Sequence, residues 1–435
     1  MSYPCYRRNG NPFFDKSKRR EWIKVRDLLI IGAGPAGLNA AIAAAKHDLR
    51  VKVIDEFPKV GGRLLGQLHE ESKDNWWNGI VEAEKLEQKA RSLGVEIECG
   101  VSVYDLRQTQ LGWTIYSSQG TLESNKLLIA TGATEVPNPV PGWTTPGSLS
   151  IGAAQVMGNV HRVKPGNTCI VIGTNVLSVA IANELRLNGV DVKGIILPPK
   201  IDGLTVGSNP TEVMESLMNL THLAPSAILR SLGKLAKFVP ASLATTFYPK
   251  SGVKIFDIPI KIKTAAVEII DDGKKVTGVK TVNVDNHGKV IAGSEQMEEV
   301  DFVCISGGLA PLPELAALTG CTFKYVPELG GHIPFHSERM ETKVPHLYLA
   351  GNITGVESAK VAMAQGTVAG LVAAQDLIGP RPEMETEIEA ALFAVKKTRK
   401  EALIQFQPGI EEAREMIYEE FNNDNGQLIN QLSAL

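Results

Sequence analysis

The sequence contains no closely spaced pair of cysteines. Its five cysteines (Cys5, Cys99, Cys169, Cys304 and Cys321) include no C-x-x-C pair, whereas dithiol redox motifs, zinc sites and iron–sulfur clusters depend on such spacings. We therefore expect no metal site. Reduced thiols in a cytoplasmic protein are the default expectation.

A large charge of one sign and a secretory signal are lacking as well. The net charge is −3 over 435 residues, which gives no electrostatic footprint for nucleic acid. The N-terminus has no apolar core of a signal peptide. The run from Leu28 to Ala45 is apolar enough to mimic a membrane span, but its three glycines and one proline favour a strand, a turn and a helix. We expect no nucleic-acid partner and no transmembrane segment.

The same run has the order of a dinucleotide-binding βαβ unit. A buried strand (28–31) is followed by Gly32-x-Gly34-x-x-Gly37, a helix (38–47) and a second strand (51–54) that ends at Asp55. The first glycine permits the tight turn, the second lets the backbone approach a pyrophosphate, and the third allows close helix–strand packing. The helix N-terminus favours the diphosphate, and Asp55 would accept hydrogen bonds from a ribose hydroxyl. The residues predicted to bind the dinucleotide here are Gly32, Gly34, Pro35, Ala36, Gly37, Asp55 and Glu56; the alternative is a turn needed only for packing.

Three further patterns extend this predicted site. Gly61-Gly62-Arg63 indicates backbone and guanidinium contacts to the same diphosphate. Two buried strands end in Ala130-Thr131-Gly132 and in Ala350-Gly351-Asn352. The additional residues assigned to the cofactor are Gly62, Arg63, Val103, Ala130, Thr131, Gly132, Gly351 and Asn352.

A second strand–turn–helix unit begins at Thr168, about 140 residues after the first. Its Gly173 corresponds to Gly32 of the first unit. Asn175 and Ser178 stand where the second and third glycines are needed, and the following strand ends in Leu197-Pro198-Pro199 without an acid for a ribose. Two nucleotide-binding domains are therefore expected, but binding of NAD(P) by the second is doubtful.

The order of these motifs resembles the flavoprotein reductases that contain two dinucleotide-binding domains. The resemblance implies an α/β fold with two Rossmann-like domains, as in glutathione reductase, and FAD as cofactor. That family usually has Asp where this chain has Asn352. The predicted organisation is a basic arm (1–26), an FAD domain (27–149 and 300–380), a second domain (150–299) with a helical insertion (211–247), and a helical tail (381–435).

A narrower resemblance rests on Pro141–Gly147, Gly152-Ala153-Ala154-Gln155 and Ser306–Pro311. These segments are similar to the FAD-binding α subunits of heteromeric amine and amino-acid dehydrogenases and oxidases, which act on sarcosine, opines, proline or hydroxyproline. The similarity covers residues 27–378. It implies a flavoprotein β subunit that oxidises the substrate, with a small electron-transfer subunit as a further partner. Because no cysteine follows Cys321, an iron–sulfur relay is absent or supplied by another subunit.

No catalytic acid, base or nucleophile stands out. His332 and His336 precede the late strand, and Glu357 and Lys360 follow it, so each is a candidate to face the flavin ring; ordinary surface or core roles are the alternative. The expected function is an FAD-dependent oxidoreductase, as the α subunit of an amine or amino-acid dehydrogenase. The alternatives are a self-sufficient NAD(P)H-dependent flavoprotein reductase and a non-catalytic nucleotide-binding subunit.

Overall fold

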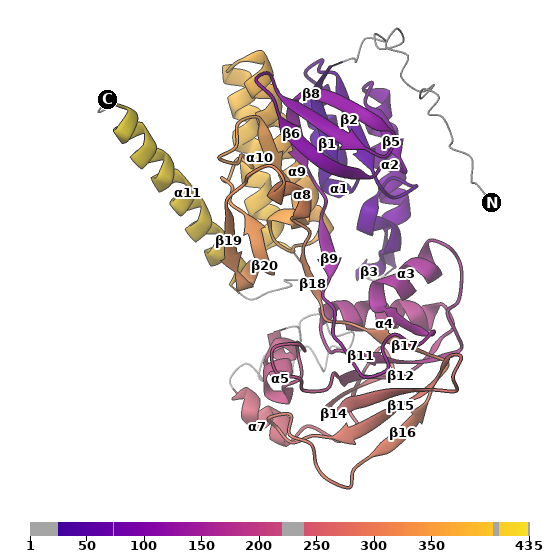
Figure 1. Ribbon diagram of the computed structural model, residues 1–435. Helices are drawn as coiled ribbons and strands as arrows, with labels where there is room; N and C mark the ends of the chain where they lie inside the picture. Colours follow the sequence, from indigo (N-terminus) through magenta and orange to yellow (C-terminus); the bar gives the residue numbers. More distant parts are fainter. Residues whose placement is uncertain (1–24, 73, 220–238, 403–408, 434–435) are drawn as a thin grey trace, which may run out of the picture.

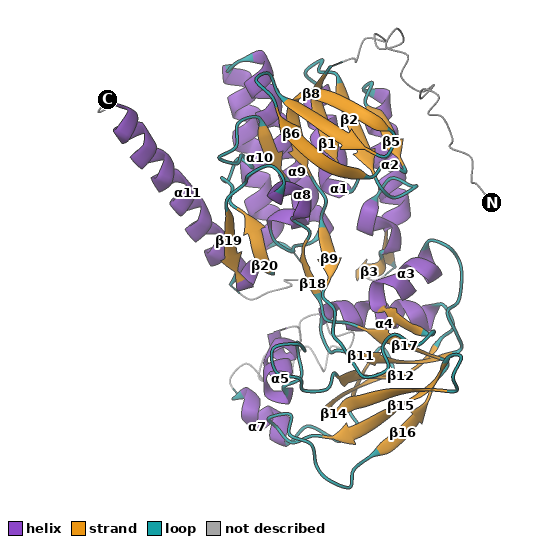
Figure 2. Cartoon of the chain, in the orientation of Figure 1, coloured by secondary structure: helices purple, strands orange, loops and turns teal. Residues whose placement is uncertain are grey.

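The computed structural model describes residues 25–72, 74–219, 239–402 and 409–433. Two lobes, each built on its own sheet, are joined by two extended strands, β9 (Ala133–Glu135) and β18 (Leu309–Pro311), which pair antiparallel (Figure 1). Each lobe combines helices with its sheet (Figure 2). The predicted α/β class with two Rossmann-like domains is confirmed.

The first lobe contains a seven-stranded sheet in the order β5-β2-β1-β8-β7-β6, with β21 also on β8. The parallel strands are β1 (Arg26–Ile31), β2 (Val51–Asp55), β5 (Glu96–Cys99), β8 (Gly120–Ile129) and β21 (Leu347–Leu349). The first half of β8 instead pairs antiparallel with β7 (Trp113–Ser117), which pairs with β6 (Val103–Gln108). Consequently β1, β2, β8 and β21 all end at the same edge of the sheet.

Successive side chains of β1 point to opposite faces of the sheet, so the core of this lobe has one part on each face. Leu28 and Ile30 pack towards α1 (Pro35–Ala45) and α9 (Ala359–Ile378), whereas Leu29 and Ile31 face the β6–β7 side. Helix α9 is long and apolar enough to cross a membrane, but 61% of its most apolar window is buried. It packs against α1 and α10 (Pro382–Lys400) and is a core helix of this lobe.

A short segment connects β2 to the next long helix of this lobe. It comprises the 3-10 turn η2 (Gly62–Gly66) and a hairpin of β3 (Leu68–Ser72) and β4 (Asn75–Asn78). Helix α2 (Gly79–Ser92) begins at Asn78, whose side-chain Oδ1 accepts hydrogen bonds from the backbone of Ile80 and Val81.

The second lobe contains an eight-stranded sheet in the order β10-β17-β11-β12-β14-β15-β16, with β13 on β14. Its strands are β10 (Ser148–Ser150), β11 (Thr168–Ile172), β12 (Asp191–Leu197), β13 (Val253–Ile255), β14 (Ile258–Asp271), β15 (Val276–Asn283), β16 (Gln296–Glu299) and β17 (Phe302–Ile305). Because β17 lies between β10 and β11, the second domain extends to Ile305. The boundary predicted at residue 300 is therefore too early.

Four helices of the second lobe are described: α3 (Ile151–Asn159), α4 (Val176–Leu187), α5 (Pro210–Asn219) and α7 (Ala241–Thr246). The last two form the described ends of the predicted helical insertion. Its middle, residues 220–238, lies outside the described residues, as does the arm predicted at 1–26 up to residue 24.

The C-terminal region packs on the first lobe. Helix α11 (Ile410–Ser433) begins against β19 (Phe323–Val326) and β20 (Gly331–Pro334) through Ile410, Ala413, Ile417 and Phe421. It then runs away from the body of the molecule (Figure 1). Helices α10 and α11 lie within the segment predicted as a helical tail (381–435), and residues 403–408 between them are not described.

Candidate functional site: a cleft at the ends of four parallel strands

The carboxyl ends of β1, β2, β8 and β21 border one cleft of about 2200 Å³, which continues between the two lobes. Ligands of open α/β sheets bind at this edge. The cleft is larger than the roughly 300–1,000 Å³ of ordinary small-molecule pockets, so it has room for an extended cofactor.

In the glycine turn after β1, the backbone itself requires glycine at Gly32 and Gly37. Gly32 has a φ of +110°, and a Cβ there would lie 2.4 Å from the carbonyl oxygen of Ala130. A Cβ on Gly37 would lie 1.8 Å from the carbonyl oxygen of Gly32, so both positions are glycine for conformation or close packing.

Gly34 differs from its two neighbours in the motif. Its φ is −76°, which any residue adopts, and a Cβ on it would meet nothing within 4 Å. It is the N-cap of α1 and provides no side-chain cap for the helix. The open space thus lies in front of a helix N-terminus, where unpaired N–H groups favour an anion such as a diphosphate.

Gly62 closes the same space from the opposite side. A Cβ on Gly62 would lie 3.2 Å from the Cα of Gly34, and its φ is +53°. The next residue, Arg63, donates from Nε and Nη2 to the carbonyl oxygen of Ala133, at 3.1 and 3.0 Å. Two glycine-containing turns therefore form a narrow cradle, with a fixed guanidinium beside it.

Asp55 and Glu56 at the end of β2 have different surroundings. Both carboxylate oxygens of Asp55 accept backbone hydrogen bonds, Oδ2 from Ala33 at 2.6 Å and Oδ1 from Phe57 at 2.7 Å. Burial raises the pKa of Asp55, and these two hydrogen bonds oppose the shift. Glu56 is exposed and lines the cleft. The sequence predicted a ribose contact for Asp55; in the structure its carboxylate fixes the loop, and the neighbouring Glu56 is the more exposed of the two acids in the cleft wall.

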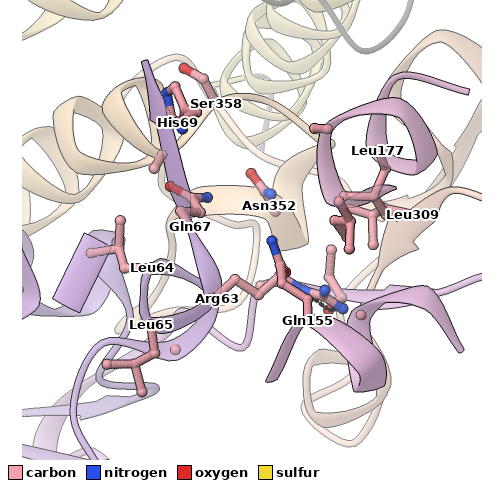
Figure 3. A pocket seen from close by; sticks show the side chains of 18 of the residues that line it. Arg63, Leu64, Leu65, Gln67, His69, Gln155, Leu177, Leu309, Asn352 and Ser358 are labelled. Atoms are coloured by element: carbon pink, nitrogen blue, oxygen red, sulfur yellow. Dashed lines mark hydrogen bonds between the residues drawn. The ribbon is translucent and has the colours of Figure 1, made fainter. Parts of the chain in front are cut away.

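The structure brings the predicted cofactor residues together around this cleft. All except Gly37, which is packed beneath the turn, line it: Gly32, Gly34, Pro35, Ala36, Asp55, Glu56, Gly62, Arg63, Val103, Ala130, Thr131, Gly132, Gly351 and Asn352. Asn352 lies between Arg63 and Leu309 (Figure 3). Its Oδ1 accepts a hydrogen bond from the backbone of Glu357, at 3.2 Å.

Several cleft residues were not found by sequence reasoning. Gln67 and His69 follow the predicted Gly-Gly-Arg turn, and Figure 3 shows them on the same side of the cleft as Ser358. Gln67 accepts a hydrogen bond from the indole of Trp77 at 3.1 Å. Desolvation in the cleft wall lowers the pKa of His69, which keeps this imidazole neutral at pH 7. The only signal for these two residues in the sequence was that they follow the Gly-Gly-Arg turn closely in the chain.

The two histidines weighed as flavin-facing groups are placed elsewhere. His336 is fully buried and does not line the cleft; its Nδ1 contacts the carbonyl oxygen of Pro334 at 2.8 Å. His332 is exposed and packs against the ring of Tyr325. Neither histidine lines the cleft, and the ordinary core and surface roles weighed for them are the ones that the structure shows.

Glu357 and Lys360 do line the cleft, as weighed from the sequence. Lys360 forms an ion pair with Glu71 at 2.5 Å and lies over the ring of Trp77. Glu357 is buried and paired with two arginines.

The turn of the second dinucleotide unit is occupied by its own side chains. Asn175 caps α4: its Oδ1 accepts from the backbone of Ser178 at 3.0 Å, and the Ser178 hydroxyl accepts from the backbone of Asn175 at 2.9 Å. The Asn175 amide also donates to the hydroxyl of Ser306, at 3.0 Å. The N–H groups that would receive a pyrophosphate are thus partly satisfied within the protein.

A buried carboxylate connects the two lobes across the cleft. Glu184 on α4 accepts hydrogen bonds from Gln155 at 2.9 Å, from Asn159 at 2.6 Å and from the backbone of Leu68 at 3.4 Å. Asn159 also donates to the carbonyl oxygen of Gly66, at 2.7 Å. Burial raises the pKa of Glu184 to about 7, against these hydrogen bonds, which lower it.

The thiols lie away from the cleft. Among the described residues, no cysteine lines it. Cys169 and Cys304 are buried on neighbouring strands β11 and β17. The described part of the chain also contains no group of His, Cys, Asp and Glu that could hold a metal ion.

Comparison with known families agrees with this geometry. Residues 26–217 match the model of the pyridine nucleotide-disulphide oxidoreductases, and residues 334–380 match that of glucose inhibited division protein A. These matches support an FAD-dependent oxidoreductase. The flavoprotein is 25% identical over 363 residues to an opine oxidase subunit of Agrobacterium tumefaciens, covering 81% of this chain and 66% of the relative. It therefore spans slightly less than two thirds of that relative's length.

Other relatives have different names. The flavoprotein is 24% identical to hydrogen cyanide synthase subunit HcnB of Pseudomonas aeruginosa, over 88% of this chain and 77% of the relative. It is also 24% identical to thioredoxin reductase of Listeria monocytogenes, over 84% of this chain and 97% of the relative.

Two solved structures share the fold. Thioredoxin reductase of T. acidophilum has a TM-score of 0.57 at 23% identity and covers 81% of this chain and 99% of its own. L-proline dehydrogenase of P. horikoshii has a TM-score of 0.59 at 17% identity and covers 84% of this chain and 59% of its own. At these identities the likeness concerns the fold.

Proposed function

We propose that this chain is the FAD-binding α subunit of a heteromeric amine or amino-acid dehydrogenase or oxidase, acting with a flavoprotein β subunit. The substrate class is a secondary amine or amino acid such as sarcosine, proline, hydroxyproline or an opine. The observation that carries the proposal is the Asn175 cap on α4, which occupies the turn where a reductase would take NAD(P)H. Electrons then have to come from another donor, and the similarity to subunits of opine oxidase and hydrogen cyanide synthase favours a partner subunit.

The residues of the cleft fit FAD. In this proposal the cradle of Gly34 and Gly62 and the N-terminus of α1 hold the diphosphate, and Glu56 accepts from a ribose hydroxyl. Asn352 has its Oδ1 engaged, so its NH2 group is available to the cofactor. When bound, FAD supplies the two-electron redox chemistry, while the protein positions it and keeps water out.

The thioredoxin reductase relatives favour one rival, an NAD(P)H-dependent reductase. Disulfide reduction requires a reactive thiol pair, and none of the described cysteines lines the cleft. Those observations count against the rival, together with the occupied turn at Asn175.

An anaerobic absorbance scan of the purified chain tests the proposal. We expect a flavin spectrum that stays oxidised after NADH or NADPH is added. In complex with its partner subunit, we expect one compound of a panel of sarcosine, proline, hydroxyproline and an opine to reduce the flavin. Rapid bleaching by NADH alone would make the NAD(P)H reductase the correct function. A flavin that no donor reduces, even in the complex, would indicate a non-catalytic subunit.

A further inference from the structure

A buried ion cluster begins in the wall of the FAD cleft, at Glu357, and extends behind it. Glu357, on the loop before α9, pairs with Nε of Arg399 at 2.5 Å and with Nη2 of Arg414 at 2.7 Å. The side chains of the three residues are 5%, 7% and 1% exposed, respectively. Arg399 lies on α10 and Arg414 on α11, so both guanidinium groups come from helices that follow the two-domain core.

The cluster holds the loop that carries Asn352 at several points. Arg414 donates to the hydroxyl of Thr354 at 3.2 Å and to the carbonyl oxygen of Gly355 at 3.4 Å. The backbone N–H of Glu357 donates to Oδ1 of Asn352.

A glutamine links the cluster to the start of the same loop. The side-chain NH2 of Gln365 donates to Glu357 at 3.4 Å, and its Oε1 accepts from the backbone of Gly351 at 3.1 Å. Gln365 therefore links Gly351, at the start of the 351–357 loop, to Glu357 at its end.

The charges of the cluster do not balance. Two guanidinium groups face one buried carboxylate, whose pKa is lowered by Arg414 and Arg399 against the effect of burial. The adjoining His336 adds no charge, because burial and the positive charge of Arg414 together lower its pKa to about 3. Another nearby carboxylate, Glu411, is exposed to solvent. One positive charge is therefore left over in a region of low dielectric next to the cleft.

We infer that Arg399 and Arg414 are positioning residues for the flavin-site loop 351–357, which makes the C-terminal helices α10 and α11 part of the FAD site. They act through Glu357: the ion pairs fix the loop that presents Gly351 and Asn352, and the surplus positive charge favours the more negative, reduced cofactor. The inference rests on FAD as the cofactor and does not depend on the substrate or the partner.

The test measures FAD binding and the flavin midpoint potential in the full-length chain. We expect Arg399→Met and Arg414→Met to raise the dissociation constant for FAD by on the order of tenfold, as is typical when a group that orients a ligand-holding residue is lost. Both variants should lower the midpoint potential, whereas Glu357→Gln should raise it. A purely structural role would not produce shifts of opposite sign.

Two further variants separate position from charge. Lys400→Met removes an exposed cation from the same helix as Arg399 and should leave both quantities unchanged. Arg414→Lys keeps the charge but loses the fork of hydrogen bonds. It should weaken FAD binding while retaining most of the wild-type potential, and it provides a milder variant if Arg414→Met does not fold.

The inference is overturned if folded Arg399→Met and Arg414→Lys bind FAD as tightly as Lys400→Met and show the wild-type potential. A wild-type chain that binds no FAD overturns it together with the cofactor assignment. Failure to find an amine donor contradicts only the proposed reaction, since the binding and potential measurements need no substrate.

Discussion

The side-chain amide of Asn175 donates hydrogen bonds to the hydroxyl and the carbonyl oxygen of Ser306, at 3.0 and 3.3 Å. This contact joins the N-terminus of α4 to the end of β17 and places a side chain where a dinucleotide-binding turn normally leaves backbone exposed. The second domain thus keeps the shape of a nucleotide-binding unit, while the N–H groups of its turn are partly satisfied by its own side chains.

Restoring the glycines of this turn should restore nucleotide affinity. We expect Asn175→Gly combined with Ser178→Gly to bind NADH more tightly than the wild type, as measured by calorimetry on the FAD-saturated protein. The lost cap and Ser306 contacts should cost about 1 kcal/mol of stability. Equal NADH affinity in both proteins would show that the side chains at this turn are not what excludes the nucleotide.

Two glycines of the first turn should respond differently to substitution. Gly34→Leu should abolish FAD retention with little change in the melting temperature of the apoprotein, because its side chain would enter open space. Gly37→Ala should destabilise the fold by about 3 kcal/mol or more, because its Cβ would lie 1.8 Å from a backbone oxygen. Gel filtration followed by flavin absorbance, and thermal unfolding, measure the two effects; full FAD occupancy in folded Gly34→Leu would contradict the assignment of the cradle.

The two acids at the end of β2 offer a second contrast. Asp55→Ala should lower the stability of the apoprotein by about 2 kcal/mol, because the N–H groups of Ala33 and Phe57 lose a charged acceptor. Glu56→Ala should leave that stability unchanged and weaken FAD binding. The comparison needs thermal unfolding of the apoproteins and FAD titrations. If Asp55→Ala leaves apoprotein stability unchanged, its loop-fixing role is wrong.

The contact between the lobes should depend on pH through Glu184. Its folded pKa of about 7 lies above the ordinary value of 4.5, so ionisation is less favourable in the folded state. Stability from this group is greatest below pH 4.5 and falls as the pH rises through 7, by up to about 3 kcal/mol. The melting temperature of Glu184→Gln should therefore gain on the wild type between pH 5 and pH 8. A constant difference across that range would show that Glu184 does not titrate there.

Local sequence patterns predicted much of the fold and most of the cradle. The apolar strand before Gly32, the glycine spacing and the end of β2 all lie within a stretch of 30 residues, and their meaning comes from backbone geometry that any sequence with this pattern shares. The same reasoning identified the altered turn at Asn175, because a missing glycine is visible in the sequence. It did not show that Asn175 would bond to Ser306, which lies 131 positions away in the chain.

Charged and polar roles depended on the tertiary structure. Asp55 and Glu56 are adjacent acids, and only the fold shows that the first accepts two backbone N–H groups of its loop and the second is exposed in the cleft. His336 was weighed as a flavin-facing group because it precedes β21, yet it lies buried beside Arg414 and does not line the cleft. Sequence separation carries no information on which way such a side chain points.

The sequence by itself determined the βαβ units, the glycine cradle and the lack of clustered thiols, because each depends on residues close together in the chain. Only the tertiary structure decided the Glu357–Arg399–Arg414 cluster, the Glu184 contact between the lobes and the place of β17 in the second sheet. These features join segments tens to hundreds of residues apart. They form only in the folded chain, because a charge or a strand edge that is buried away from water is costly unless it is paired.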